Sequence, residues 1–472
     1  MTIHLILLIA YSVGLTIGGL WISRFVRGSG DFFVAGRRLS APLLFATVLA
    51  ANIGAGTTVG AAGLAYSQGV SAWWWNGSAA IGSLALAFWI GPRIWRLASA
   101  RGFYTIGDFL EYRYSAAVRG GVAALIWVGT LAILAAQLIA GAAVLDVVAG
   151  VSRPVGIVIG AAVMTIYFAA GGLLSSAWVN LVQLIVLIAG FLFAMPLLYD
   201  AAGGRAAFAS LTPPHPDYWN VMYSTGSGMS GWSMLAVLTP AFIISPGLVQ
   251  KTYGAASERA IRLGIGGQAF AQMAFACIPV FYGIAARAAG LSIDNPNLVL
   301  PTVLATELTP VVGALGLAAV FSAEVSTCDA ILFMLATSLS KDLYKRFLNP
   351  AATDRQLLTV ARIAAFAGGI GGVLLALQVK TIVDALQIFY SLLGVSLFVP
   401  VLAGLLWRRG GAPEAFASIA AGIGVLLFVR IATDGNGFGF LSENLAGLAA
   451  AAAAFGILAA VRGSRAVFRE PA

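Results

Sequence analysis

Charged residues are scarce in this sequence, and their scarcity excludes a soluble globular protein. Of the 472 residues, 10% are charged and 60% are hydrophobic, whereas soluble domains carry about 25% charged residues. The mean hydropathy is +0.93. A lipid bilayer therefore supplies the apolar medium, and it is the first partner that the sequence predicts.

Cysteine and histidine are also rare, with two residues of each. Cys277 and Cys328 lie in different apolar segments, so they offer neither a disulfide framework nor a metal-ligand spacing. His4 lies near the N-terminus and His215 lies in a long loop, so no Ser/His/Asp or Cys/His set is expected to assemble. We therefore predict no catalytic residues and no enzymatic activity.

Long apolar runs recur along the chain, each long enough to cross about 30 Å of hydrocarbon. They predict an all-α multi-pass membrane protein with about 13 transmembrane helices. The expected helices cover residues 2–22, 40–66, 70–92, 120–145, 154–171, 177–198, 231–250, 262–286, 312–338, 360–379, 385–407, 412–432 and 444–461. The first run lacks the basic flank and cleavage site of a signal peptide, so we expect a retained helix.

The basic residues predict how these helices are oriented. With the N-terminus outside, most of the 27 Lys and Arg residues fall in inner loops, as the positive-inside rule requires. This predicts a cytoplasmic C-terminus and a bacterial-type inner (plasma) membrane. The net charge of +9 then reflects anionic lipid, so no nucleic-acid partner is expected. No obligatory protein partner is evident either.

One apolar segment, residues 321–340, carries polar groups at its centre. Glu324, Ser326, Thr327 and Asp329 lie within six positions of FSAEVSTCDAILFMLATSLS. A charge near the bilayer centre costs about 2.5–3.5 kcal/mol, so acids kept there indicate that the segment binds something cationic. The alternative is a buried acid pair that hydrogen-bonds a neighbouring helix.

Glycine and proline predict that two helices are interrupted. The second expected helix reads AANIGAGTTVGAAG from Ala50, and the seventh reads LTPAFIISPGLVQ from Leu238. In lipid, broken helices are tolerated where they line a cavity. Two such helices five apart predict an inverted repeat, helices two to six and seven to eleven, with a solute site at mid-membrane. The alternative is that the glycines serve close helix packing.

This repeat divides the chain into four parts. They are an N-terminal helix and inner loop, the first repeat, an outer loop with the second repeat, and two C-terminal helices with a short cytoplasmic tail. Their predicted ranges are 1–39, 40–200, 201–407 and 408–472.

Several stretches between residues 31 and 346 resemble the sodium:solute symporter family, whose core is a LeuT-like five-plus-five inverted repeat. The stretches are DFFVAGRRLS from Asp31, AANIGAGTTVG from Ala50, RGFYTIGDFLEYRY from Arg101, GGLLSSAWVNLVQ from Gly171, PGLVQKTYGAASERAIRLG from Pro246 and SKDLYK from Ser340. Together they are typical of the family and do not identify a substrate.

The resemblance implies a sodium site made of five residues. Ala50 and Ile53 match the family's backbone-carbonyl ligands in the first interrupted helix. Ala323 matches a third carbonyl ligand, and Ser326 and Thr327 match the hydroxyl ligands of an Ala-x-x-Ser-Ser/Thr pattern. Oxygen donors suit a hard cation. The alternative is that the two hydroxyls bond back to their own helix.

Two departures from the family pattern bear on further sites. Asn52 and Asn180 stand where some family members carry an acid, so Asp329, together with Asn180, is a possible site for a second cation or a proton. The predicted solute contacts are Asn52, Gly54, Thr57, Trp74, Ile244, Gly247 and Glu324. For Trp74, an interfacial aromatic belt is the alternative.

The predicted function is a secondary active symporter, in which inward sodium flow drives uptake of a small polar organic solute by alternating access. One alternative is an intramembrane enzyme, for which Glu324 and Asp329 are the only candidate acid pair. The other is a transporter-like solute sensor.

Overall fold

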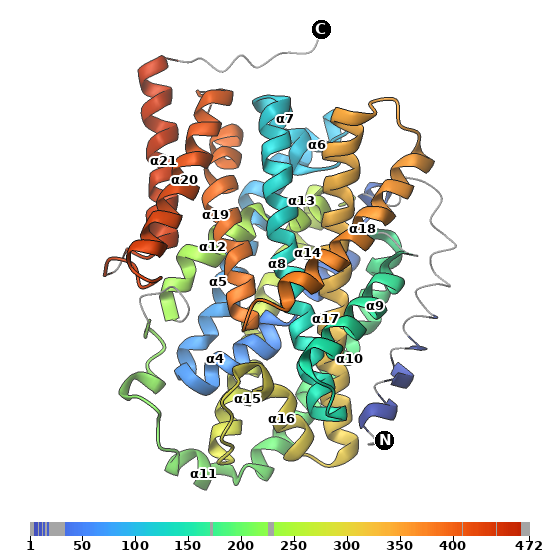
Figure 1. Ribbon diagram of the computed structural model, residues 1–472, viewed down its shortest axis with the longest axis vertical. Coiled ribbons are helices and arrows are strands. Elements are labelled where there is room, and N and C mark those ends of the chain that lie inside the picture. The colour runs from blue at the N-terminus through green and yellow to red at the C-terminus, as the bar shows by residue number, and fades with distance from the viewer. Residues whose placement is uncertain are drawn as a thin grey trace.

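The computed structural model describes residues 4–7, 9–11, 13–14, 17, 34–169, 173–224, 231–407, 409–439 and 441–463. Side chains at 35 and 165–179 fall outside this description, as does part of the first expected helix, 2–22. The described residues form helices and two isolated bridges, with no sheet among them. The first described residues and the end of the last helix lie at opposite ends of the bundle (Figure 1).

The helices follow the expected apolar runs closely. They are α3 (Ala41–Asn52), α4 (Ala61–Gln68), α5 (Trp73–Ala85), α6 (Gly91–Arg101), α7 (Ile106–Arg113), α8 (Ala116–Ala149), α9 (Arg153–Ala169), α10 (Leu173–Ala201), α11 (Gly204–Ser210), α12 (Met234–Ile244), α13 (Pro246–Tyr253), α14 (Glu258–Phe275), α15 (Cys277–Ala288), α16 (Val299–Thr306), α17 (Pro310–Thr337), α18 (Asp354–Ala376), α19 (Ile382–Leu406), α20 (Ala412–Ala432) and α21 (Glu443–Arg462). The all-α prediction is confirmed.

The described residues do not confirm the predicted number of membrane crossings. Within the described residues, nine helices are long and apolar enough to cross a membrane, or ten if one bent pair counts as a single span. In the region of the fifth expected helix, the apolar stretch Arg153–Met164 is shorter than a full span. The count of thirteen is therefore not confirmed.

Helix α18 illustrates why the sequence folds in lipid. Its large residues Ile363, Phe366 and Ile370 are 59%, 63% and 51% exposed, a stripe that would be unusual on a soluble monomer. Its small residues, including Gly368 and Gly372, are buried against neighbouring helices. Small residues allow close helix approach in membranes, while large aliphatic side chains face the hydrocarbon.

The first interrupted helix is broken where the glycines predict it. Helix α3 ends at Asn52, Ile53 is extended (φ −95, ψ 92), and a π-helical turn, Gly56–Gly60, leads into α4. Helix α3 and the segment Gly56–Arg101 are bent by 63° relative to each other. The N–H of Gly54 donates to Thr57 Oγ1 at 2.7 Å, and that of Ala55 donates to Gln137 Oε1 at 2.9 Å. These two bonds satisfy N–H groups that would otherwise bond within a continuous helix.

The second interruption is confirmed at Ser245, between α12 and α13. Ser245 is not helical (φ −50, ψ 121), and Pro246 follows it as the first residue of α13. Proline lacks an N–H and is pre-shaped for the first helical turn, so this sequence ends one helix and begins the next.

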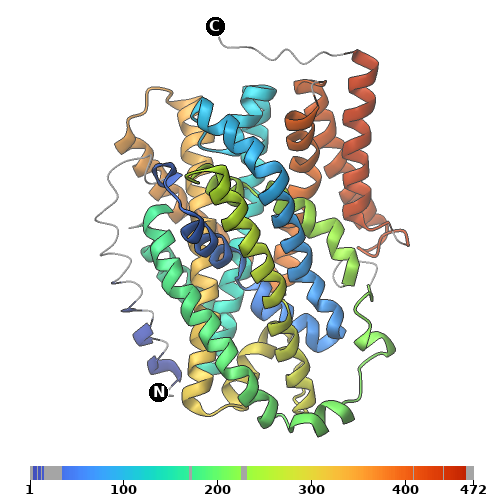
Figure 2. The same cartoon turned by 180° about the vertical axis from the view of Figure 1, so that it is seen from behind.

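Helix α17 is the central element of the bundle. It packs against α3, α8, α10 and α18, and Figures 1 and 2 show it running through the bundle while α20 and α21 stand at one edge. Because α17 adjoins the break in α3, its polar residues can face carbonyl groups that the break leaves without helical partners.

Candidate ion and solute site

The two hydroxyl side chains of α17 face the broken end of α3. Ser326 Oγ lies 2.9 Å from the carbonyl oxygen of Ala50 and 3.0 Å from that of Ala323. Thr327 Oγ1 lies 3.4 Å from the Ala50 carbonyl oxygen and 3.3 Å from the Ile53 carbonyl oxygen. The structure thus brings together all five residues of the predicted sodium site, which we call the oxygen cluster.

The cluster exists because α3 stops where it does. The carbonyl of Ala50 would accept from the N–H of Gly54 in a continuous helix, but that N–H donates to Thr57 instead. The carbonyl oxygens of Ala50 and Ile53 are therefore available to other partners. The bond from Ser326 to Ala323 is the within-helix alternative, and it occurs beside the contact with α3 rather than in place of it.

All members of the oxygen cluster are neutral and buried. Ser326 is 1% exposed and Thr327 is 5% exposed. Neutral oxygen donors in a dry setting suit a hard cation of low charge. In the part of the chain that the structure describes, no group of three or more His, Cys, Asp or Glu residues gathers into a metal site.

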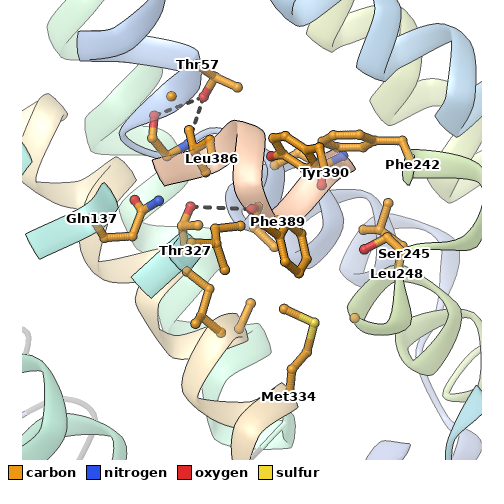
Figure 3. Close-up of a pocket in the computed structure, with 18 of the residues that line it drawn as sticks. Thr57, Gln137, Phe242, Ser245, Leu248, Thr327, Met334, Leu386, Phe389 and Tyr390 are labelled. Atoms are coloured by element: carbon orange, nitrogen blue, oxygen red, sulfur yellow. Dashed lines mark hydrogen bonds between the residues drawn. The ribbon is translucent and has the colours of Figure 1, made fainter. Parts of the chain in front are cut away.

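A small cavity of about 50 Å³ adjoins the oxygen cluster. Thr327, Gln137 and Thr57 border one part of it, while Phe242, Tyr390 and Ser245 border another (Figure 3). The remaining lining residues are Ala51, Asn52, Gly54, Gly56, Ile133, Gly247, Leu248, Lys251, Ala330, Ile331, Met334, Leu386 and Phe389. The cavity is mainly apolar and aromatic, with a few amide and hydroxyl groups.

The predicted solute contacts divide into two groups. Asn52, Gly54, Thr57 and Gly247 line this cavity. Ile244, Trp74 and Glu324 are not among the residues that line it. Trp74 is turned toward the loop after α11, where its indole N–H donates to the Val221 carbonyl at 2.8 Å.

Trp75, which is not among the predicted solute contacts, approaches the cavity where Trp74 does not. Its ring packs edge-to-face against Tyr390, with centroids 6.2 Å apart. A Cβ built on Gly56 would lie 3.2 Å from Trp75 Nε1. The sequence alone does not show which of the three consecutive tryptophans faces the cavity. Neighbouring helical positions point about 100° apart, so the answer depends on how α5 is rotated about its axis.

Glu324 is fully buried on another side of α17. A Cβ built on Gly141 of α8 would lie 3.4 Å from Glu324 Oε2. Neither carboxylate oxygen of Glu324 has a hydrogen-bond partner among the described residues. The side chain therefore lies between helices and away from the cavity.

Lys251 corrects one sequence-based inference. The seventh expected helix ends at residue 250, which placed Lys251 in the loop that follows it. Instead α13 continues to Tyr253, so Lys251 lies one turn beyond Gly247, is 2% exposed and lines the cavity. Its Nζ donates to the Thr47 carbonyl oxygen at 2.6 Å and contacts Thr47 Oγ1 at 3.1 Å.

A buried ion network lies beyond the cavity. A second, smaller space shares Met334 with the cavity and reaches Asp342. Arg119 Nη2 pairs with Asp342 Oδ1 at 2.7 Å, and Arg119 Nη1 pairs with Asp108 Oδ1 at 2.9 Å. Arg119 also pairs with Glu111. Burial favours the neutral form of Glu111, but hydrogen bonds from Arg346 and Arg119 outweigh it, so the pKa of Glu111 lies below its ordinary value.

Comparison with known proteins identifies the family. The model of the sodium:solute symporter family matches residues 32–422. The chain is 25% identical to the sodium/glucose cotransporter of Vibrio parahaemolyticus, over 90% of this chain and 84% of that protein. It is 23% identical to the high-affinity proline transporter PutP of Bacillus subtilis, over 89% of this chain and 90% of that protein.

A solved structure shares the fold. The substrate-bound, outward-open state of a Na+-coupled sialic acid symporter matches with a TM-score of 0.81 at 19% identity, covering 98% of each chain. These relatives and the structural neighbour are transporters and not enzymes, as the absence of a catalytic set in the sequence predicted. The chain belongs to the sodium:solute symporter family, a family of membrane transporters with a LeuT-like fold.

Proposed function

We propose that this protein couples inward sodium flow to the uptake of a small polar organic solute by alternating access. The observation that carries the proposal is the position of Ser326 and Thr327 opposite the broken end of α3. Sodium would bind among the oxygens of Ala50, Ile53, Ala323, Ser326 and Thr327.

The spacing of these oxygens supports a cation of sodium's size. Around a hard cation with ligands at about 2.4 Å, neighbouring oxygens of an octahedral shell lie about 3.4 Å apart. Thr327 Oγ1 lies 3.3 to 3.4 Å from three carbonyl oxygens, those of Ala50, Ala51 and Ile53. A sodium ion could therefore bind among these oxygens with only small movements of the side chain and backbone.

Thr327 connects the oxygen cluster to the cavity. Thr327 belongs to the cluster and also lines the cavity, and Ala51 and Gly54 line the cavity beside it. A cation held between α3 and α17 would fix this wall of the cavity in position. By linkage, a solute that needs the wall in that position binds better when sodium is present, and the reverse also holds.

The direction of transport rests on the orientation of the chain. The distribution of basic residues supports an outer N-terminus and a cytoplasmic C-terminus in a bacterial-type inner membrane. In this orientation the space that reaches Asp342 leads toward the cytoplasm, and the Arg119 network lies at the inner end of the route.

The test is uptake by the purified protein in proteoliposomes with an inward sodium gradient or an equal potassium gradient. Pools of amino acids, carboxylates, amines and sugars would be screened, including glucose, proline, sialic acid and pantothenate, which the names of relatives suggest. Accumulation that requires the sodium gradient supports the proposal. Equal accumulation of every solute with both cations contradicts it.

A further inference from the structure

The side-chain amide of Gln137 on α8 is held in one orientation by the break in α3. Its Oε1 accepts a hydrogen bond from the N–H of Ala55 at 2.9 Å. A backbone N–H pairs with an amide oxygen and not with an amide nitrogen, so this contact decides which end of the side chain is which. Gln137 is 1% exposed and lines the cavity. Its amide nitrogen is therefore the end that is left to the cavity.

This amide nitrogen is a donor without an acceptor. It carries two N–H groups and makes no hydrogen bond with any residue that the structure describes. Figure 3 shows Gln137 and Thr327 on the same side of the cavity. A donor that is kept away from water without an acceptor is costly. The nitrogen is thus placed to bind an oxygen atom of a solute.

The charges around the cavity indicate what kind of oxygen that is. The oxygen cluster is neutral, and none of the described residues that line the cavity is Asp or Glu. Glu324 and Asp329, the two acids of α17, are not among the lining residues. A sodium ion in the cluster would bring a positive charge that no lining side chain balances. A carboxylate on the solute balances that charge, and it accepts a stronger hydrogen bond than a neutral oxygen does.

We propose that Gln137 binds a carboxylate oxygen of the solute through its amide nitrogen, so that the transported solute is a small carboxylate. The inference rests on the proposed function, because it names the class of solute that the same cavity takes up. It also gives Gln137 a role that the sequence did not assign to it.

The same side chain links the solute to the sodium site. A Cβ built on Gly54 would lie 2.8 Å from Gln137 Oε1 and 2.5 Å from Thr327 Oγ1, so these two oxygens flank the break together. Ala55, which donates to Gln137, follows Ile53 by two residues, and the Ile53 carbonyl belongs to the oxygen cluster. A carboxylate on the amide nitrogen would hold the amide oxygen at the break. Solute and sodium then favour the same arrangement, and each strengthens the binding of the other.

The experiment is thermal unfolding of the purified full-length protein in detergent, with three carboxylates and their matched alcohols as probes. The pairs are lactate and propylene glycol, proline and prolinol, and pantothenate and pantothenol. In sodium chloride, at least one of the three carboxylates should raise the unfolding midpoint of the wild type, as a ligand of the native state does, and its alcohol should not. Stabilisation by none of the carboxylates, or equal stabilisation by a carboxylate and its alcohol, would overturn the solute class.

Gln137→Met keeps the length of the side chain and removes both amide atoms. It should raise the sodium concentration for half-maximal stabilisation at least about fivefold, because the N–H of Ala55 loses its acceptor. It should also abolish the carboxylate effect, even at saturating sodium. Gln183→Met is the matched control, because Gln183 is an equally buried amide that does not line the cavity, and it should keep both effects. A carboxylate effect that returned in Gln137→Met at saturating sodium would overturn the solute contact and leave Gln137 as a cap of the break.

Gln137→Glu is the second variant if Gln137→Met does not fold. It keeps an oxygen for the N–H of Ala55 and replaces the amide nitrogen by a second oxygen. At alkaline pH it should keep the sodium effect and lose the carboxylate effect, since two carboxylates repel each other. A carboxylate effect equal to that of the wild type would overturn the proposal. A wild type that sodium does not stabilise would instead refute the proposed function.

Discussion

Gly54 and Thr327 approach each other so closely that no side chain fits between them. A Cβ built on Gly54 would lie 2.5 Å from Thr327 Oγ1 and 2.8 Å from Gln137 Oε1. These two oxygens belong to the wall that the cavity shares with the oxygen cluster. Only glycine fits at position 54, because the Thr327 hydroxyl must reach the carbonyl oxygens at the end of α3.

Gly54→Ala should therefore abolish or strongly reduce sodium-driven uptake. The methyl group must displace Thr327 or Gln137, which moves an oxygen of the proposed sodium site or uncaps the N–H of Ala55. We expect the sodium concentration for half-maximal uptake to rise at least about tenfold, equivalent to about 1.4 kcal/mol. Gly424→Ala in α20 is the matched control, because nothing lies within 4 Å of its built Cβ. Equal sodium dependence in the two variants would show that Gly54 is not part of the site.

Cysteine labelling should distinguish Ser245 from Ile244. The two residues are adjacent at the break before α13, but Ser245 lines the cavity and Ile244 is fully buried outside it. On a background without Cys277 and Cys328, Ser245→Cys should react with a small water-soluble thiol reagent. A transported solute should slow that reaction, and Ile244→Cys should be inert. Equal reactivity at both positions would mean that the second interruption serves packing and not solute access.

Arg119 should be the basic residue whose loss destabilises the protein most at the predicted inner end. Its side chain is 9% exposed and it pairs with Asp342, whose side chain is 4% exposed. Arg119→Gln leaves the buried carboxylate of Asp342 without its cation, and breaking such a pair costs about 3–5 kcal/mol.

Arg96→Gln is the control for this change. Arg96 pairs with Glu258 at 3.0 Å, but its side chain is 61% exposed, and an exposed pair contributes at most about 1 kcal/mol. Thermal unfolding in detergent, followed by loss of the monodisperse peak, should rank Arg119→Gln well below Arg96→Gln. Similar midpoints for the two variants would indicate that water reaches the Arg119 network.

The sequence predicted the backbone of this site better than the direction of its side chains. The interruption at Gly54 and Gly56 follows from composition, since glycine within an apolar helix removes packing and permits a bend. The three- and four-residue spacing of Ala323, Ser326 and Thr327 places them on adjacent faces of one helix. That α3 lies opposite this face depends on packing between distant segments, and the family resemblance was needed to infer it.

Lys251 was missed for a physical reason. Basic residues at the end of an apolar run usually mark the membrane surface, and Lys251 follows the run 231–250 directly. The break at Ser245 shifts the second half of the helix, so α13 is still inside the bundle when it reaches Lys251. The sequence did contain a signal that the helix continues past Lys251. The segment after Lys251 includes Tyr253 and carries no charged residue until Glu258.

The most direct test of the central claim is sodium binding by the variant that lacks both hydroxyls, because it requires no knowledge of the solute. The wild type should be stabilised against heat in detergent by sodium chloride over potassium chloride at equal ionic strength, as expected for an ion that binds the native state. Ser326→Ala combined with Thr327→Ala should lose that difference while its unfolding midpoint in potassium stays near that of the wild type. Ser396→Ala, which removes a buried hydroxyl bonded to its own helix, should keep it. A double variant that retained the full sodium effect would contradict the assignment of the oxygen cluster as the sodium site.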